Sequence, residues 1–242
     1  MSVVHAPDPT RLSTFDYGEA VVRQRALIEA RQRGETPDGV WYLEHPPVVT
    51  WNPGRGQEHL RLEPEALRTR GVAVEACDRG GDVTYHGPGQ LVGYPIIELR
   101  DGTPPGRDLH GYLHALEEAL IVALRSWTIE GSRCSGRTGV WIDRAVDGAT
   151  VSAKIAAMGV RVRRWVTGHG FALNVTCDLA PFREFIVPCG ISDADVTSLK
   201  EILGERAPRS GDVVESVHRA LEASLGRPLA RTFNGKDWLT NE

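Results

Sequence analysis

Apolar residues recur every three or four positions in three long stretches of the chain, which is the spacing of one face of an α-helix. The strongest stripe begins after Asp108, a residue type suited to an N-cap, and predicts a helix that ends near Trp127. The same spacing predicts helices over 17–33 and 212–225, each followed by a glycine. A shorter helix is expected over 64–71, where a proline occupies the first turn.

Shorter apolar runs between the helices predict β-strands, and turn-forming residues separate them. The runs cover residues 40–44, 48–51, 72–75, 82–86, 91–99, 140–142, 152–163 and 170–175. Asp147-Gly148 and Gly168 are the turn signals between the last three runs. Strands in pairs that alternate with helices favour the α/β class (α+β type), with one mixed β-sheet flanked by helices. No long linker divides the chain, so we expect a single domain over 1–242.

The composition of the 242 residues is that of an ordinary globular protein, with 41% hydrophobic and 25% charged residues. Residues 1–9 hold no apolar run and no later stretch approaches membrane-spanning length, so we expect no signal peptide, no membrane segment and a cytoplasmic location. The net charge of −4 gives no general reason to expect nucleic-acid binding. Arg161, Arg163 and Arg164 form a local basic cluster, which is either a solvated strand face or a surface that steers an acidic partner.

The cysteines are scattered without a C-x-x-C pair, which argues against a zinc ribbon, and in a cytoplasmic chain we expect free thiols. They are Cys77, Cys134, Cys177 and Cys189. Cys189 lies between Pro188 and Gly190, which fix the backbone and leave the sulfur approachable, as a nucleophile requires. The simpler alternative is a small buried hydrophobe. With an ordinary pKa of about 8.5, only roughly a few per cent of a thiol is ionised at neutral pH, so a nucleophile needs a base or cation nearby.

Lys154 is the candidate for that base, because it lies among small apolar residues in the run 152–159. The chain otherwise prefers arginine, and its lysines are Lys154, Lys200 and Lys236. Desolvation can remove the proton from a lysine, whereas a guanidinium stays charged, so arginine could not replace lysine in this role. The alternative is a strand lysine whose ammonium reaches solvent.

The segment 79–90 combines four glycines and a proline with a short alternating run of Thr84, Tyr85 and His86. Glycine in such a run predicts close approach of the backbone to a ligand, so we interpret the segment as a binding wall. It matches neither the P-loop nor the dinucleotide-binding fingerprint. His86 and His169 both neighbour glycines and could orient a carbonyl or accept a proton, although a lone histidine is more often structural. Neither shows a spacing that favours a zinc site.

Five ordered motifs resemble those of lipoyl(octanoyl) transferases and span about 44–200 of the chain. They are Arg79–Gln90 with Leu91–Pro95, Arg137–Trp141, Lys154–Val160, His169–Asn174 and Pro188–Gly190. The resemblance implies a fold like that of lipoate and biotin protein ligases. It also implies transfer of an octanoyl group from acyl carrier protein to a specific lysine on lipoyl domains of 2-oxoacid dehydrogenases and on the glycine cleavage H protein.

By position in these motifs, the resemblance implies that Cys189 is the acyl-accepting nucleophile and Lys154 its activating partner. The residues that it implies for substrate binding are Arg79, Gly80, Gly81, Asp82, Val83, Thr84, Tyr85, His86, Ala157, Met158, Gly159, Gly170, Phe171 and Ala172. Exchange of one thioester for another requires no ATP, so we expect neither a cofactor nor a metal. Backbone amides of the glycine-rich walls are expected to stabilise the oxyanion.

The chain departs from the family pattern after residues 44–47, where a stretch of the Thr-Leu-Gly-Arg type is usual and this chain has a different loop over 50–56. We therefore assign no role to Arg55. Two alternatives remain. One is an ATP-dependent lipoate or biotin ligase of the same fold, which the motif at 188–190 disfavours, and the other is a non-catalytic module that binds acyl carrier protein or lipoyl domains.

Overall fold

The elements of the chain are known from a computed structural model, which describes residues 12–54, 57–146, 149–187 and 195–233. Its helices are α1 (Tyr17–Gln32), α2 (Pro64–Thr69), α3 (Leu109–Arg125), α4 (Ala180–Phe185), α5 (Leu199–Leu203) and α6 (Ser210–Leu225), with 3-10 turns η1 (Gln57–His59) and η3 (Gly204–Arg206). Its strands are β1 (Gly39–Leu43), β2 (Val48–Trp51), β3 (Ala73–Ala76), β4 (Thr84–His86), β5 (Gln90–Ile96), β6 (Ser132–Cys134), β7 (Arg137–Val146), β8 (Ala149–Arg163), β9 (Val166–Asn174), β10 (Asp195–Val196) and β11 (Ala230–Thr232).

The three long helices match the predicted ranges to within two residues, and caps are found at three of their ends. The Asp16 carboxylate accepts hydrogen bonds from the first backbone N–H groups of α1, and Asp108 accepts one from the N–H of His110 in α3. At its other end, α6 is closed by Gly226 in the left-handed conformation, with φ of 63°. None of the helices in the described ranges is both long and apolar enough to cross a membrane.

The strands form one large mixed sheet and one small sheet. In the large sheet the order is β11-β1-β5-β9-β8-β7-β6, and β10 pairs with β8. Its neighbours are antiparallel except at β1–β11 and β8–β10. The small sheet has the order β3-β2-β4 and holds the short strand of the glycine-rich segment. The predicted class, a mixed sheet flanked by helices, is therefore confirmed, and the small sheet is an addition to it.

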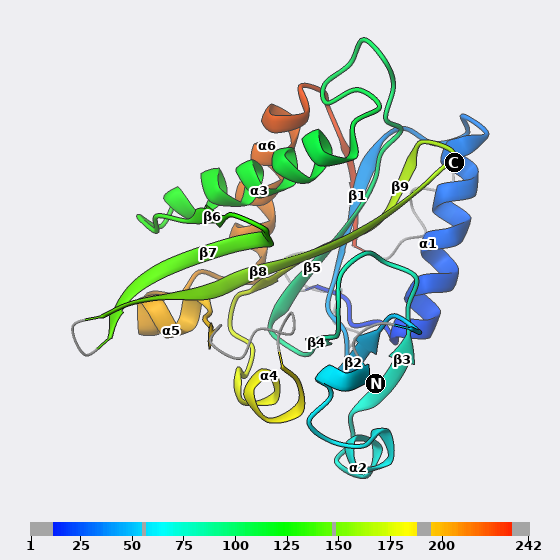
Figure 1. Cartoon of the computed structure of the whole chain (residues 1–242). Coiled ribbons are helices and arrows are strands. Elements are labelled where there is room, and N and C mark those ends of the chain that lie inside the picture. Colours follow the sequence, from blue (N-terminus) through cyan, green and yellow to red (C-terminus); the bar gives the residue numbers. More distant parts are fainter. Residues whose placement is uncertain (1–11, 55–56, 147–148, 188–194, 234–242) are drawn as a thin grey trace, which may run out of the picture.

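Helices cover both faces of the large sheet (Figure 1). The side chains of β1 contribute alternately to the two cores. Val40 and Tyr42 belong to the larger core with α3 and α6, whereas Trp41 and Leu43 belong to the core under α1. This alternation follows from the two-residue period of a strand, and every position of β1 is buried as a result.

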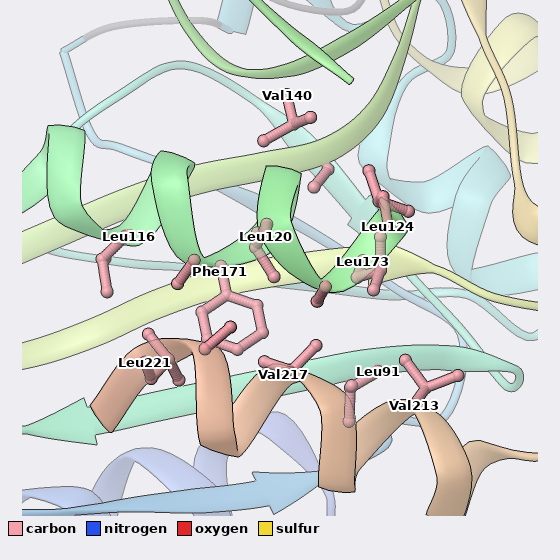
Figure 2. Close-up of a cluster of buried hydrophobic side chains, with 14 of the residues drawn as sticks. Leu91, Leu116, Leu120, Leu124, Val140, Phe171, Leu173, Val213, Val217 and Leu221 are labelled. Carbon is pink, nitrogen blue, oxygen red and sulfur yellow. The ribbon is translucent and has the colours of Figure 1, made fainter. Parts of the chain in front are cut away.

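The larger core is formed by one stripe from each of two helices against the central strands. Figure 2 shows Leu116, Leu120 and Leu124 of α3 facing a row from α6, with Phe171 and Leu173 of β9 close to both. The long stripe predicted from the sequence for 108–127 is therefore the helix face that packs on the sheet. This packing holds β8 and β9 in place from the side opposite α1.

The turn predicted at Gly168 is wrong. The β8–β9 hairpin turns at Arg164 and Trp165, which have φ of 50° and 63°, and Gly168 lies inside β9. Two consecutive positive φ angles are typical of a tight hairpin turn. Asparagine and glycine are the usual residues at such positions, but this turn is formed by arginine and tryptophan. Gly168 has a different reason to be glycine, because a Cβ there would lie 2.7 Å from Cδ1 of Ile28 in α1. The glycine lets α1 pack closely on the sheet.

Candidate active site

A cavity of about 570 Å³ lies between β8 and β9 on one side and the glycine-rich segment 79–84 on the other. Its size is within the range of about 300–1,000 Å³ that is usual for small-molecule sites. The predicted site residues that line it are Lys154, Arg79, Gly80, Gly81, Asp82, Val83, Thr84, His86, Ala157, Met158, Gly159, Gly170, Phe171 and Ala172. Four of the five motifs, although far apart in sequence, thus contribute residues to one described space; the fifth, around Cys189, lies outside the described residues.

The floor of the cavity is made by small residues at paired positions of β8 and β9. Ala157 pairs with Ala172, and Gly159 pairs with Gly170. Because alternate residues of a strand share a face, these two pairs lie on the same face of the sheet. The methyl groups of Ala157 and Ala172 leave space above the strands for a ligand, whereas the backbone of Gly80 and Gly93 occupies the positions that Cβ atoms on Gly159 and Gly170 would take.

The glycine-rich wall lies directly on this floor. The Gly80 N–H donates to the carbonyl of Val160 over 2.9 Å, and a Cβ on Gly159 would lie only 2.5 Å from the Gly80 carbonyl oxygen. Arg79, which is buried, anchors the wall to β2 through Nη2, which donates to the carbonyl and the hydroxyl of Thr50 over 3.2 and 3.0 Å. Gly159 is therefore required for close packing of the protein's own backbone.

The expectation for Tyr85 requires correction, since its side chain faces away from the cavity. Thr84 and His86 line the cavity, so the strand period turns Tyr85 to the opposite face. There its ring packs edge-on against Phe182 and Phe185, with centroid distances of 5.3 and 6.3 Å. Tyr85 supports the wall from behind and does not line the space.

Lys154 lies at one end of the cavity and is only 7% exposed. Its Nζ donates to the carbonyl of Thr138 over 3.1 Å and lies 4.6 Å from the centroid of the Trp141 ring. An aromatic face and a carbonyl oxygen both stabilise a positive charge. The side chain is therefore held inside the molecule, which excludes the alternative of a strand lysine that reaches solvent.

The histidines near the opposite end of the cavity are neutral. Burial lowers the pKa of His86 to about 3, and nearby His45 lowers it further in the same direction. His45, whose pKa burial lowers to about 4, lies between the Phe15 carbonyl and the Tyr94 hydroxyl, at 2.7 and 2.8 Å. His86 contacts Oε1 of Gln90 over 2.7 Å. His86 therefore presents a polar but uncharged side chain to the cavity.

His169 has an unusual backbone, with φ of 54° inside β9, which takes its side chain out of the strand alternation. Its Nε2 lies 2.8 Å from Oδ1 of Asp78, and the other oxygen of Asp78 forms an ion pair with Arg161. Burial lowers the pKa of His169 to about 4, and the neighbouring Arg79 adds to this effect. The candidate role of His169 as a proton acceptor is thus opposed by its surroundings.

Cys189, the predicted nucleophile, lies outside the described residues. The chain before that segment is fixed beside the cavity, because the Val187 N–H donates over 2.8 Å to the carbonyl of His59, a cavity residue. The chain after it pairs with the strand of Lys154, where Val196 is the direct partner of Lys154. Within the described part of the chain, the cysteines are free thiols, and burial raises the pKa of Cys177 to about 12, which keeps it protonated.

Proteins of named activity resemble the chain over most of its length. An octanoyltransferase of Geobacter metallireducens is 47% identical over 206 residues, which cover 85% of this chain and 87% of that protein. One of Acidobacterium capsulatum is 45% identical over 223 residues, with coverage of 90% and 89%. The chain belongs to the octanoyltransferase family. The family described as "Lipoyl protein ligase A/B catalytic domain" matches residues 16–222, a wider span than the motif-bearing region.

Membership of the octanoyltransferases makes the chain an acyltransferase, so the alternative of a non-catalytic module is wrong. A solved structure, that of the bi-partite lipoate protein ligase of Thermoplasma acidophilum, is similar with a TM-score of 0.67 at 16% identity and covers 94% of this chain and 88% of that one. At this identity the similarity concerns the fold alone, and it confirms the expected likeness to lipoate ligases.

In this octanoyltransferase, the sequence interpretation did not identify two residues that contact Lys154, namely Thr138 and Trp141. Both belong to the motif at 137–141, but a threonine and a tryptophan suggest no chemistry by themselves. The signal that could have identified Trp141 is its place in the sheet, where it is the cross-strand partner of Lys154. His45 was also missed, and nothing in its local sequence distinguishes it from a structural histidine.

Proposed function

We propose that the protein transfers an octanoyl group from octanoyl-acyl carrier protein, through a thioester on Cys189, to the ε-amine of a specific lysine on lipoyl domains. The observation that carries this proposal is Lys154, a buried lysine at the end of a cavity whose floor is made of small residues. The activity of the named relatives supports the acyl group, and the chemistry of a thioester donor supports the nucleophile.

In the first step, Sγ of Cys189 attacks the carbonyl carbon of the carrier thioester. The bond from that carbon to the pantetheine sulfur breaks, and a new carbon–sulfur bond to Cys189 forms. Lys154, as the neutral amine, accepts the thiol proton and returns it to the departing pantetheine sulfur. Trp141 and the Thr138 carbonyl stabilise the ammonium that exists between these two transfers.

In the second step, the amine of the acceptor lysine attacks the Cys189 thioester. The new carbon–nitrogen bond replaces the carbon–sulfur bond, and the proton that the amine loses passes through Lys154 to the cysteine sulfur. The enzyme returns to its starting state, and the product is an amide. No bond of ATP is broken, because the donor thioester already provides the driving force.

The cavity suits an aliphatic acyl chain. Each buried CH₂ group contributes about 0.8 kcal/mol, so seven carbons beyond the carbonyl contribute on the order of 5 kcal/mol to binding. The paired small residues Ala157 and Ala172 leave room for such a chain where they line the cavity.

The proposed acceptor is a lipoyl domain, in the cytoplasm where acyl carrier protein is found. The similar structure from Thermoplasma acidophilum was described together with its E2 lipoyl domain, which supports an acceptor of this kind. The glycine cleavage H protein is the second acceptor that we propose.

The rival activity within the same fold is ATP-dependent ligation of a free acid. The test is to incubate the protein with an apo lipoyl domain and either octanoyl-acyl carrier protein alone or octanoate with ATP. We expect modification of the domain only with the carrier-bound substrate, and loss of that modification in Lys154→Ala. Modification that requires ATP would overturn the proposal in favour of a ligase.

A further inference from the structure

Lys154 is held by a peptide unit that has left the regular strand pairing. Thr138 and Gly139 lie in β7, yet in the described ladders neither has a cross-strand partner on β6 or β8. The register of β7 shifts against both neighbouring strands near this point, as in a β-bulge. Bulges are common beside active sites, because they free backbone groups for other contacts.

Both ends of the peptide between Thr138 and Gly139 are used. Its carbonyl accepts the hydrogen bond from Nζ of Lys154 over 3.1 Å, and its N–H donates to Oε1 of Glu117 over 3.0 Å. The peptide unit is planar, and its C=O and N–H point in opposite directions. A residue that fixes the N–H therefore also fixes the direction of the carbonyl.

Glu117 is a buried carboxylate on α3 with only 5% exposure. Its Oε2 lies 3.2 Å from Nε of Arg133, while Oε1 accepts from Gly139. A carboxylate in the core of a helix–sheet interface is costly unless its oxygens are used, and here both are. Arg133 thus fixes the Glu117 carboxylate, and the carboxylate in turn fixes the N–H of Gly139.

Because residue 139 is a glycine, the orientation of the peptide between Thr138 and Gly139 depends on the hydrogen bond to Glu117. Its φ of +125° is open to glycine but disfavoured for other residues, and a Cβ there would lie 2.5 Å from the Ala156 carbonyl and 3.4 Å from Cε of Lys154. A glycine also lowers the barrier to rotation of the adjoining peptide plane. Without an acceptor at Glu117, the buried N–H would lack a partner, which favours rotation of the peptide away from Lys154.

We propose that Glu117 is a positioning residue for Lys154, acting through the peptide between Thr138 and Gly139. This inference rests on the proposed function in so far as Lys154 transfers protons, but the position of Lys154 can be measured independently of activity. The chain of contacts runs from the Glu117 carboxylate to the Gly139 N–H, and from the Thr138 carbonyl to Nζ.

The first test compares three variants. Glu117→Ala removes the acceptor, Glu117→Gln keeps an oxygen that can accept from Gly139, and Glu118→Ala is the matched control. Glu118 is adjacent on α3 and binds the same Arg133 at 2.7 Å. For transfer from an octanoyl thioester, we expect Glu117→Ala to lower kcat about tenfold or more with little change in KM, Glu117→Gln to stay within about threefold, and Glu118→Ala to match the parent protein.

The second test observes Lys154 itself. Because the chain has three lysines, reductive methylation with ¹³C-formaldehyde gives few lysine signals in a ¹H–¹³C spectrum, and Lys154→Arg assigns the one of interest. We expect Glu117→Ala to shift that signal, while Glu117→Gln and Glu118→Ala leave it close to the parent position. Should Glu117→Ala fail to fold, Glu117→Met fills a similar volume without an acceptor and takes its place.

An unchanged Lys154 signal and an unchanged kcat in the variant without an acceptor would overturn the inference. Equal losses in Glu117→Ala and Glu117→Gln would also overturn it, since the hydrogen bond would then not be the cause. Failure of the proposed function looks different, because the parent protein itself would transfer no acyl group while the methyl signal still reported the position of Lys154.

Discussion

Lys154 and Trp141 are cross-strand partners, and Nζ of Lys154 lies 4.6 Å from the centroid of the indole ring. The indole N–H is engaged elsewhere, donating to the carbonyl of Arg137 over 3.1 Å, so the ring face is what Trp141 offers to the lysine. Trp141 is almost fully buried, so its ring also shields this side of the lysine from solvent. The proton acceptor of the proposed reaction thus lies against a surface that favours its charged form.

Replacement of Trp141 by leucine should slow formation of the acyl-enzyme. Loss of a cation–π contact costs about 0.5–2 kcal/mol, which corresponds to roughly 2- to 30-fold in rate if the ammonium is formed in the transition state. Trp141→Phe is the control, because it keeps an aromatic face but also loses the indole N–H. Single-turnover rates with folded variants measure the effect, and equal rates for the leucine and phenylalanine variants would contradict it.

Gly159→Ala should disturb the glycine-rich wall. The new methyl group would lie 2.5 Å from the Gly80 carbonyl oxygen and 2.9 Å from Cδ of Arg79, so the wall must move. We expect a loss of about 1–3 kcal/mol in the free energy of unfolding, together with weaker binding of the acyl substrate. Gly102→Ala is the comparison, since no atom lies within 4 Å of its Cβ position and only the strain of a φ of 81° applies. Chemical denaturation should separate the two, and equal losses would show that overlap at Gly159 is not decisive.

The buried histidines predict a loss of stability on acidification. The folded protein holds the pKa of His86 at about 3, below the value of about 6.5 in an unfolded chain, so between these values the unfolded chain binds more protons. The free energy of unfolding should therefore fall as the pH drops from about 6.5 towards 3, and be unaffected by this group above 6.5. His86→Gln should reduce the slope by up to about 1.4 kcal/mol per pH unit. Exposed His110→Gln should leave it unchanged, and a parent-like slope in His86→Gln would refute the assignment.

The exposed arginines at the β8–β9 hairpin should affect the encounter with an acidic carrier protein. Arg161 already forms an ion pair with Asp78, so Arg163 and Arg164 are the better residues to test. Reversal of both charges to glutamate should lower kcat/KM for carrier-bound octanoate by about tenfold at low salt, and less at high salt. A small octanoyl-pantetheine substrate should be unaffected. Equal losses with both substrates would argue against steering.

The long helices could be predicted because each carries its own signals, such as the Asp108 cap and the leucine stripe that follows it. Short strands such as β10 and β11 carry too few residues for a pattern, and only their partners in the sheet stabilise them. Gly168 could not be assigned correctly for a different reason. In the sequence, a glycine that close helix packing requires cannot be distinguished from a glycine that forms a turn. Tyr85, by contrast, could have been assigned to the outer face from the strand period alone.

For the site, the motifs gave the residues around the cavity but not the way in which Lys154 is held. Glu117 and Gly139 are 22 residues apart and interact only because α3 packs beside β7. A single sequence contains no sign of such a contact. Likewise, the neutral state of His86 depends on burial, which its neighbours in sequence do not reveal.

The most direct test of the account is intact-mass spectrometry of the protein mixed with octanoyl-acyl carrier protein in the absence of ATP. We predict a gain of one octanoyl group on Cys189 that hydroxylamine removes, that is absent in Cys189→Ala, and that an apo lipoyl domain discharges as an amide. Transfer to the lipoyl domain that proceeds unchanged in Cys189→Ala, or a parent protein that never gains the acyl group, would contradict the central claim.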